Sequence, residues 1–356
     1  MSKLYSLMKY SRVFINSLAY ELAPQVVSSS ELEFRLAPLY QKFRIPMGQL
    51  AALTGIEERR WWPKGHVLSD GALLAARKAI DETGINVGDL GAVVYTGVCR
   101  DQHEPATACR IAAELGVSKN TAIYDISNAC LGVLSGILDI ANRIELGQIK
   151  AGLVVSCESA RHIVDITIDH MLAEPTMQNF AQSLATLTGG SGAVAVILTD
   201  GSLPLRNERQ HQLLGASHLS APEHHDLCQW GLQEVGPQLY REFMRTDGVT
   251  LLKEGVQLAR DTWSHFLAQR DWVVENVDKV ICHQVGASNR RQVLNALNIP
   301  VNKEFPTYKL MGNMGSVSLP ATAAMAHDHG FLKSGDNVSF LGIGSGLNCM
   351  MLGLKW

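Results

Sequence analysis

Short runs of apolar, β-branched residues alternate along this chain with longer segments in which apolar residues recur at helical spacing. The first series predicts strands at 91–98, 121–126 and 151–157, and helices at about 106–115 and 131–146. A second series predicts strands at 278–285, 305–310 and 337–344, with helices at about 288–297 and 318–329. Strands that alternate with helices are typical of an α/β sheet covered by helices.

The two series resemble one another, and equivalent elements are separated by roughly 185 residues, as in an internal repeat. The segments IELGQIKAGLVV near residue 150 and GFLKSGDNVSFL near residue 335 both have the pattern of a helix end, a glycine turn and a buried strand. We therefore predict a duplicated chain, with an N-terminal half at 1–200 and a C-terminal half at 201–356. A single site near the pseudo-twofold axis would draw residues from both halves.

Two segments fall outside this repeat. The stretch from about Arg161 to Gln269 is richer in Met, His and polar residues, and we interpret it as a helical cap that begins as an insertion into the N-terminal half. Its part at 163–190 is rich in Met and Leu, which could line alkyl channels or form plain core. Near the start of the chain, Ser30 and Glu33 have the spacing of a capping box in front of an amphipathic helix.

Composition and charge exclude several classes of protein. The chain has 46% hydrophobic and 18% charged residues, which is typical of a soluble globular protein. A net charge of -3 gives no reason to expect nucleic acid or an anionic membrane as a partner. No segment approaches about 18 uncharged apolar residues in a row, and the start lacks a signal-peptide pattern. We therefore expect no integral membrane segment and a cytoplasmic location.

The seven cysteines are scattered and never spaced C-x-x-C, which favours reduced thiols over a disulfide framework or a structural zinc site. A cysteine is most often a small buried hydrophobe. Cys130 stands apart, because it follows a predicted strand and lies at the predicted start of a helix, in DISNACLGVLSG. Unpaired N–H groups and a partial positive charge at a helix start would lower its pKa and stabilise a nucleophilic thiolate.

Three further motifs lie at strand ends in the second half. His283 ends the predicted strand in ICHQVGASNRR, and Asn313 lies in the glycine-flanked turn of KLMGNMGSVSLP. The last motif, FLGIGSGLNCMM, places glycines after a buried strand, where backbone N–H groups can approach a ligand closely. Each motif alone has a structural explanation as a strand end or a turn. Their joint occurrence at matching points of a duplicated half favours a functional site.

These four motifs, NACLG, HQVG, GNMGS and GIGSGLN, resemble the active-site signatures of ketoacyl synthase III-like enzymes of the thiolase superfamily. The resemblance covers nearly the whole chain, including TGIEERRWW at 54–62. It implies an α/β, thiolase-like fold, five-layered α-β-α-β-α, built from two duplicated halves. The nearest likeness is to the members that join two fatty acyl-CoA molecules head to head at the start of bacterial long-chain olefin biosynthesis.

The resemblance also implies a role for each motif residue. Cys130 would be the nucleophile that carries an acyl group, and the backbone N–H groups of Cys130, Ser345 and Gly346 would bind the oxyanion. His283 and Asn313 would stabilise the oxyanion and the enolate.

In the same way, Glu104 in CRDQHEPATA matches a general base on a loop that reaches the active site of the neighbouring subunit of a homodimer. Without the family, Glu104 would be a charge near a helix start. The base matters, because a malonyl thioester yields its enolate by losing CO2, whereas a plain acyl-CoA must lose a proton.

The expected reaction is therefore a non-decarboxylative Claisen condensation of two long-chain acyl-CoAs to a 2-alkyl-3-oxoacyl-CoA, with no cofactor and no metal. Downstream enzymes of the olefin pathway are candidate partners. The alternatives are a decarboxylative 3-oxoacyl-[acyl-carrier-protein] synthase III, an acyl-CoA thioester hydrolase that uses the same Cys, His and Asn, and a catalytically silent partner subunit.

Other positions refine these expectations. After His283 the chain reads Gln284, Val285 and Gly286, where ketoacyl synthase III enzymes have Gln-Ala-Asn, and this departure weakens the case for an acyl-carrier-protein partner. Arg59, Arg60 and Trp61, next to Trp62, are candidates for holding CoA phosphates and adenine, since arginine binds phosphate well. The alternative is a charged turn that the tryptophans anchor to the core.

Overall fold

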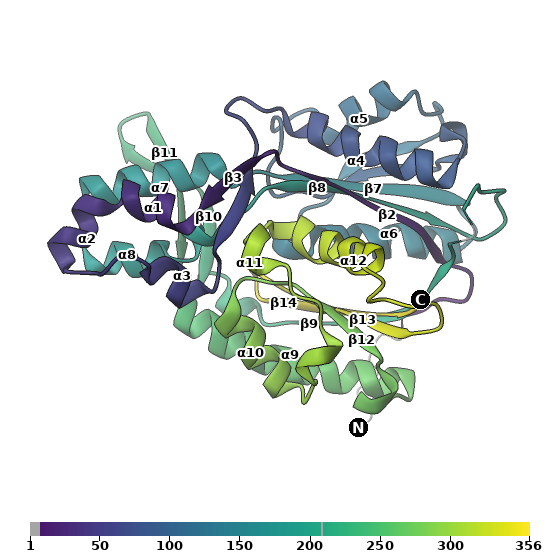
Figure 1. Cartoon of the computed structure of the whole chain (residues 1–356). Coiled ribbons are helices and arrows are strands. Elements are labelled where there is room, and N and C mark those ends of the chain that lie inside the picture. The colour runs from purple at the N-terminus through teal and green to yellow at the C-terminus, as the bar shows by residue number, and fades with distance from the viewer. Residues whose placement is uncertain (1–7, 208) are drawn as a thin grey trace.

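The structure, a computed structural model, describes residues 8–207 and 209–356 and contains one long path of hydrogen-bonded strands. Its order is β12 (Lys279–Cys282), β13 (Asn337–Gly344), β14 (Asn348–Lys355), β9 (His211–Ser220), β2 (Phe14–Leu22), β8 (Gly192–Thr199), β7 (Ala151–Glu158), β5 (Ala92–Tyr95) and β6 (Ala122–Asp125), with β1 (Met8–Lys9) beside β9. Only the pairs Phe14 with Gln212 and Ile15 with His211 join β2 to β9. The path therefore divides there into an N-terminal wing (β2 and β5–β8) and a C-terminal wing (β9 and β12–β14), which lie in separate layers (Figure 1).

The two wings repeat the same order of strand directions. In the N-terminal wing, β5 and β7 are parallel, and β8 and β2 follow as antiparallel neighbours. In the C-terminal wing, β12 and β13 are parallel, and β14 and β9 follow as antiparallel neighbours. The strand order is thus mirrored about the junction of β2 and β9, as a duplication predicts. The division of the chain near residue 200 stays a prediction.

Helices form three layers around the wings (Figure 1). The outer helices α4 (Leu68–Thr83) and α5 (Thr107–Leu115) cover the N-terminal wing, α6 (Gly132–Glu145) and α12 (Ser318–Asp328) lie between the wings, and α9 (Gly248–Arg270) and α10 (Ala287–Ala296) cover the C-terminal wing. The predicted five-layered α-β-α-β-α fold is therefore confirmed. Because helices cover both faces of the N-terminal wing, β7 and β8 are buried at every residue. No helix in the described part of the chain has the length and apolar character to cross a membrane.

Glycines let the central helix α6 pack directly on the N-terminal wing. A Cβ atom on Gly132 would lie 2.0 Å from the carbonyl oxygen of Thr96, and one on Gly136 would lie 2.7 Å from the side chain of Val154. Larger residues would push the helix off the strands. This close contact fixes the start of α6, which begins two residues after Cys130.

The predicted cap at about 161–269 is wrong in part, because β8 and β9 lie in this stretch and belong to the wings, and α9 covers the C-terminal wing. The remaining elements of this stretch and several elements near the start of the chain gather at one side of the molecule (Figure 1). They comprise α1 (Ser29–Arg35), α2 (Ala37–Phe43), α3 (Gln49–Thr54), α7 (Arg161–Ala173) and α8 (Met177–Ser183), the strand pair β3 (Gln25–Ser28) and β4 (Glu58–Trp61), and the hairpin of β10 (Cys228–Gly236) and β11 (Leu239–Thr246). The helices share a hydrophobic core of their own, and the hairpin packs against α7 and α8. We call these elements the cap.

The predicted capping box at Ser30 is wrong, because the N-cap lies two residues earlier. Ser28 is the N-cap of α1, and its hydroxyl accepts a hydrogen bond from the backbone N–H of Glu31. Glu33 serves a tertiary contact instead, because its buried carboxylate accepts from the backbone N–H groups of Gly48 at 2.7 Å and Leu50 at 2.6 Å.

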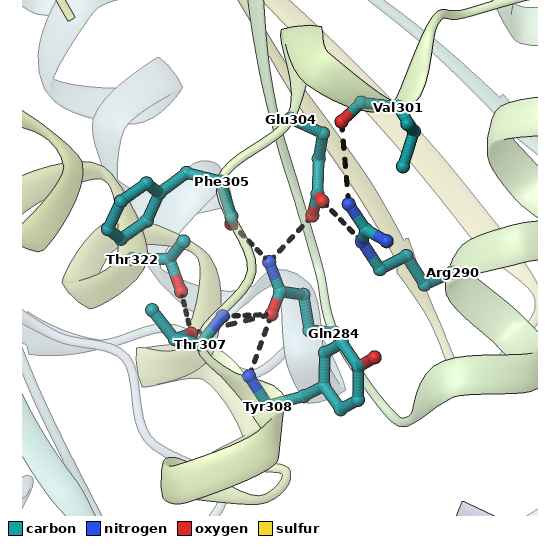
Figure 2. Close-up of polar contacts among 8 residues, drawn as sticks. All are labelled: Gln284, Arg290, Val301, Glu304, Phe305, Thr307, Tyr308 and Thr322. Atoms are coloured by element: carbon teal, nitrogen blue, oxygen red, sulfur yellow. Dashed lines mark hydrogen bonds and ion pairs between the residues drawn. The ribbon is translucent and has the colours of Figure 1, made fainter. Parts of the chain in front are cut away.

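The predicted strand at 305–310 is also wrong. Glu304 forms one isolated parallel bridge to β12, and the short helix α11 (Tyr308–Met311) occupies much of the remaining segment. A side chain takes the place of a neighbouring strand, because Oε1 of Gln284 accepts from the backbone N–H groups of Thr307 at 2.7 Å and Tyr308 at 2.9 Å (Figure 2). These N–H groups are therefore unavailable to a sheet.

Candidate active site

A cavity of about 1140 Å³ lies where the two wings meet the cap. Cys130, His283 and Asn313 all line it, so the structure brings together candidate residues from both halves of the chain. Most of the remaining wall is apolar and includes Ile163, Leu184, Trp230, Phe243, Val293 and Leu347. Such a wall suits long hydrocarbon chains, whose burial is favourable in proportion to the apolar area removed from water.

Cys130 is half-buried in a 3-10 turn, Ala129–Leu131, between β6 and the first residue of α6. The pKa of its thiol is raised to about 12, first by burial and then by the electrostatic effect of Cys228 and Glu158. The expectation of a lowered pKa is therefore wrong, because the loss of solvation outweighs the partial positive charge of the helix start. In the free protein at neutral pH, Cys130 is a thiol that needs a proton acceptor before it can attack.

His283 follows β12, where its backbone N–H donates to the carbonyl of Leu341 at 2.9 Å. The imidazole is 8% exposed, and neither ring nitrogen has a hydrogen-bond partner among the described residues. Burial lowers the pKa of His283 to about 4, so the ring is neutral at physiological pH. A neutral imidazole has one nitrogen that can accept a proton and one N–H that can donate a hydrogen bond.

Asn313 follows Gly312, whose φ of 65° needs glycine. Its backbone N–H donates to Thr188 at 2.9 Å, and its carbonyl accepts from Gly190 at 2.8 Å. The side-chain Oδ1 accepts from the N–H of Gly315 at 3.0 Å. With its oxygen held in this way, the amide can present its N–H groups to the cavity.

The C-terminal glycine turn lies against the Cys130 turn. A Cβ atom on Gly344, the last residue of β13, would lie 3.5 Å from the backbone nitrogen of Cys130. Ser345 lines the cavity, and the side chain of Asn348 donates to Oδ1 of Asn128 at 3.1 Å. The turn is therefore fixed beside Cys130, although its role and that of Gly346 in binding an oxyanion stay predictions.

Gln284 connects the His283 strand to the segment that leads to Asn313 (Figure 2). It is 2% exposed, and its Nε2 donates to Oε1 of Glu304 and to the carbonyl of Phe305, each at 2.7 Å. The other oxygen of Glu304 pairs with Arg290 at 2.5 Å. Since Gln284 also holds the first turn of α11, one amide side chain helps to fix His283 relative to Asn313.

Glu104 is exposed and does not belong to the cavity wall of its own chain. It lies in the loop between β5 and α5. The root of this loop is held by other residues, because Asp101 accepts from the backbone N–H groups of Leu68 and Ser69 at the start of α4. Within one chain, the structure thus leaves Glu104 apart from Cys130, and its action in a partner subunit stays a prediction.

The buried positions of Arg59 and Trp61 contradict the prediction that they bind CoA. Arg59 is 0% exposed, and its guanidinium donates to the backbone of β3 and of Leu187 and to Ser29. Burial lowers the pKa of Arg59 to about 10. Trp61 is 3% exposed and donates to the carbonyl of Gly189 at 3.1 Å. Arg60 is half-buried, and its role toward CoA stays a prediction.

Sequence reasoning missed Glu158, a buried carboxylate at the end of β7 that lines the cavity. The signal was present, because AGLVVSCE is an apolar strand that ends in one charged residue, and a charge is rarely buried without a specific partner. It also missed Cys228, a half-buried cysteine at the start of β10 that lines the same cavity. Within the described ranges, no group of three or more His, Cys, Asp or Glu residues could hold a metal ion.

Known proteins are similar to this chain over almost its full length. The family model for the C-terminal part of 3-oxoacyl-[acyl-carrier-protein] synthase III matches residues 267–356. A Shewanella oneidensis protein named acyl-CoA:acyl-CoA alkyltransferase is 86% identical over 349 residues, which are 98% of this chain and 100% of the relative. A Xanthomonas campestris protein of the same name is 34% identical over 351 residues, which are 98% of this chain and 100% of the relative.

A solved structure extends the similarity to three dimensions. It is that of a cysteine-to-serine variant of Xanthomonas campestris OleA with bound lauric acid and lauroyl-CoA. It matches with a TM-score of 0.89 at 33% identity and covers 98% of this chain and 100% of that chain.

Proposed function

Because this chain belongs to the family of acyl-CoA:acyl-CoA alkyltransferases and OleA, within the ketoacyl synthase III-like part of the thiolase superfamily, we propose that it condenses two fatty acyl-CoA molecules without decarboxylation. The products are a 2-alkyl-3-oxoacyl-CoA and one free CoA, at the first step of long-chain olefin biosynthesis. The shared cavity with Cys130, His283 and Asn313 on an apolar wall is the observation that carries this proposal.

The first half-reaction transfers an acyl group from CoA to Cys130. At neutral pH the thiol is protonated, since its pKa is about 12, and His283 is neutral, since its pKa is about 4. The imidazole can take the thiol proton as the sulfur attacks the thioester carbonyl, and can then return it to the departing CoA sulfur. The backbone N–H groups of Cys130, Ser345 and Gly346 are the candidate donors to the tetrahedral oxyanion.

The second half-reaction forms the carbon-carbon bond. The second acyl-CoA must lose a proton from its α-carbon, which is a very weak acid unless the enolate oxygen is stabilised. We assign this task to the N–H of neutral His283 and to the side-chain amide of Asn313, and loss of one such donor should cost about 3 kcal/mol. The enolate carbon then attacks the acyl-Cys130 carbonyl. The Cys130 sulfur leaves, and the proton taken from the α-carbon ends on it.

The size and lining of the cavity support two acyl chains as its contents. Sites for drug-sized ligands span about 300–1,000 Å³, and this cavity is larger, at about 1140 Å³. The chemistry uses only side chains and backbone groups of the protein, so we propose that no cofactor or metal takes part.

The base for the second half-reaction is proposed to come from a second copy of the chain. Glu104 lies on an exposed loop, outside the cavity wall of its own protomer. In a symmetric homodimer, the loop of each protomer would enter the site of the other. All seven cysteines are free thiols, which suits a reducing cytoplasm. There the product would pass to later enzymes of the olefin pathway.

One assay separates this function from its alternatives. The purified protein is incubated with a single saturated long-chain acyl-CoA, with EDTA and without any malonyl thioester, while released thiol is measured and products are identified by mass spectrometry. A branched 3-oxo acid, or the ketone that forms when it loses CO2, is the expected product, and a Cys130→Ala variant should not form it. Free fatty acid as the sole product would identify a hydrolase. Activity that requires a malonyl thioester would identify a decarboxylative synthase.

A further inference from the structure

Glu158 is a buried carboxylate without a basic partner in the part of the chain that the structure describes. It is 4% exposed, and it lines the same cavity as Cys130. Removing a carboxylate from water is expensive unless hydrogen bonds or charges replace the lost hydration. The groups that replace the lost hydration of Glu158 therefore indicate what this residue does.

Backbone and hydroxyl donors from two separate segments surround the carboxylate. Oε1 accepts from the backbone N–H of Val98 at 3.0 Å and from the hydroxyl of Ser316 at 2.6 Å, with the backbone N–H of Ser316 at 3.4 Å. Oε2 accepts from the backbone N–H of Cys99 at 3.1 Å. A carboxylate has about four acceptor positions, so these contacts use most of its capacity. Such a group is an effective anchor for the segments that donate to it.

The two anchored segments carry candidate groups of the second half-reaction. Val98 and Cys99 lie near the start of the loop that carries Glu104, between β5 and α5. Ser316 follows the turn of Asn313, and a Cβ atom on Gly315 would lie 3.3 Å from the Glu158 carboxylate. Glu158 therefore joins the root of the Glu104 loop to the Asn313 turn, at the wall of the Cys130 cavity.

We propose that Glu158 is a positioning residue for carbon-carbon bond formation, which sets the Asn313 amide against the acylated Cys130 of its own protomer and directs the Glu104 loop toward the site of the partner. This inference rests on the proposed condensation. The two half-reactions should depend on Glu158 differently. Acyl transfer uses Cys130 and His283, which Glu158 does not hold, whereas enolate formation uses the groups at the ends of both anchored segments. A misplacement of about 1 Å can cost a hundredfold in rate.

The charge of Glu158 gives a second, independent readout. It is one of the groups that raise the pKa of Cys130, after burial and Cys228. Removing this charge should therefore shift the alkylation of Cys130 toward lower pH. This shift would show that the charge is lost in a protein that remains folded, so that the selective loss of condensation can be assigned to Glu158.

The test compares Glu158→Gln with Glu33→Gln. Glu33 is also a buried carboxylate that accepts two backbone N–H bonds, but it lies in the cap and not on the cavity wall. Acylation of Cys130 is followed by intact-protein mass after one turnover, and condensation by product mass. In Glu158→Gln, acylation should stay within about threefold of the wild type while condensation falls about a hundredfold. Glu33→Gln should slow neither step selectively.

A milder variant protects the test against misfolding. Ser316→Ala removes the shortest contact to Glu158, together with the contact of the same hydroxyl to Ser156 at 2.8 Å, but keeps the charge of Glu158. Condensation should therefore slow by about tenfold, and the pH profile of Cys130 alkylation should not change. Equal losses of acylation and condensation in Glu158→Gln, or wild-type condensation, would overturn the inference. Failure of the wild-type enzyme to condense acyl-CoA would instead reject the proposed function. The pH profiles of Cys130 alkylation would still show the effect of the Glu158 charge in that case.

Discussion

The alkylation of Cys130 by iodoacetamide should rise about tenfold with each pH unit between roughly pH 6 and 9, without reaching a plateau. The thiolate is the reactive form, and burial raises the pKa of this thiol to about 12. His283, which lines the same cavity, does not provide a compensating positive charge in this range, because its own pKa is lowered to about 4. The free protein should therefore hold a neutral thiol and a neutral imidazole in the same cavity.

The size of the effect follows from the pKa. An ordinary cysteine has a pKa of about 8.5, so at pH 7 about 3% of it is thiolate. With a pKa of about 12, the thiolate fraction of Cys130 at pH 7 is about one in 100,000. Its alkylation should thus be roughly 3,000-fold slower than that of an unfolded cysteine, before any effect of access.

The measurement is peptide mass spectrometry of the alkylated protein at a series of pH values. The unfolded protein in urea supplies the reference rate, and Cys130→Ala identifies the relevant peptide. His283→Ala should leave alkylation nearly unchanged yet slow acyl transfer strongly, since we propose that the imidazole accepts the thiol proton during transfer. A plateau with a midpoint between about pH 5 and 8 would show a thiolate–imidazolium pair and refute this account of activation.

Three further outcomes are expected. Replacing Gln284 by Met leaves the buried polar groups that bind its amide without hydrogen-bond partners. The free energy of unfolding should therefore fall by about 2–5 kcal/mol in urea titrations. The folded-state pKa of His283 is lowered from 6.5 to about 4, so stability should be lost as pH falls through this window, by about 3 kcal/mol, and His283→Asn should flatten the acid limb. Mixing the inactive variants Cys130→Ala and Glu104→Gln should restore about a quarter of wild-type activity if the base acts across a symmetric dimer, whereas no recovery after subunit exchange would reject that arrangement.

The sequence pattern was a good guide to regular elements. The predicted strands at 91–98, 151–157 and 337–344 correspond to β5, β7 and β13. Continuous apolar runs and helical spacing identify such elements because both depend on residues close in the sequence. The strand predicted at 305–310 failed for the opposite reason, because a side chain about twenty positions earlier, Gln284, takes its backbone N–H groups.

The site residues show the same contrast between features that depend on nearby residues and features that depend on distant ones. The motifs located Cys130, His283 and Asn313, which share one cavity. The burial of Arg59 was also encoded locally, because β4 alternates between half-buried and buried positions and places Arg59 and Trp61 on the same inward face. The raised pKa of Cys130 could not be predicted, because its helix-start position is a local property whereas its desolvation depends on the cap and both wings.

The separation of the two wings explains why one cavity can serve two different reactions. The Cys130 turn is fixed by the contact of α6 with the N-terminal wing and by the glycine turn of the C-terminal wing. Asn313 is fixed by a different set of contacts, to Thr188 and Gly190 beside the cap. Because these sets share few groups, a change in one should alter acyl transfer or condensation without the other. Glu158, which contacts both the Glu104 loop and the Asn313 turn, is where such a separation is expected to be sharpest.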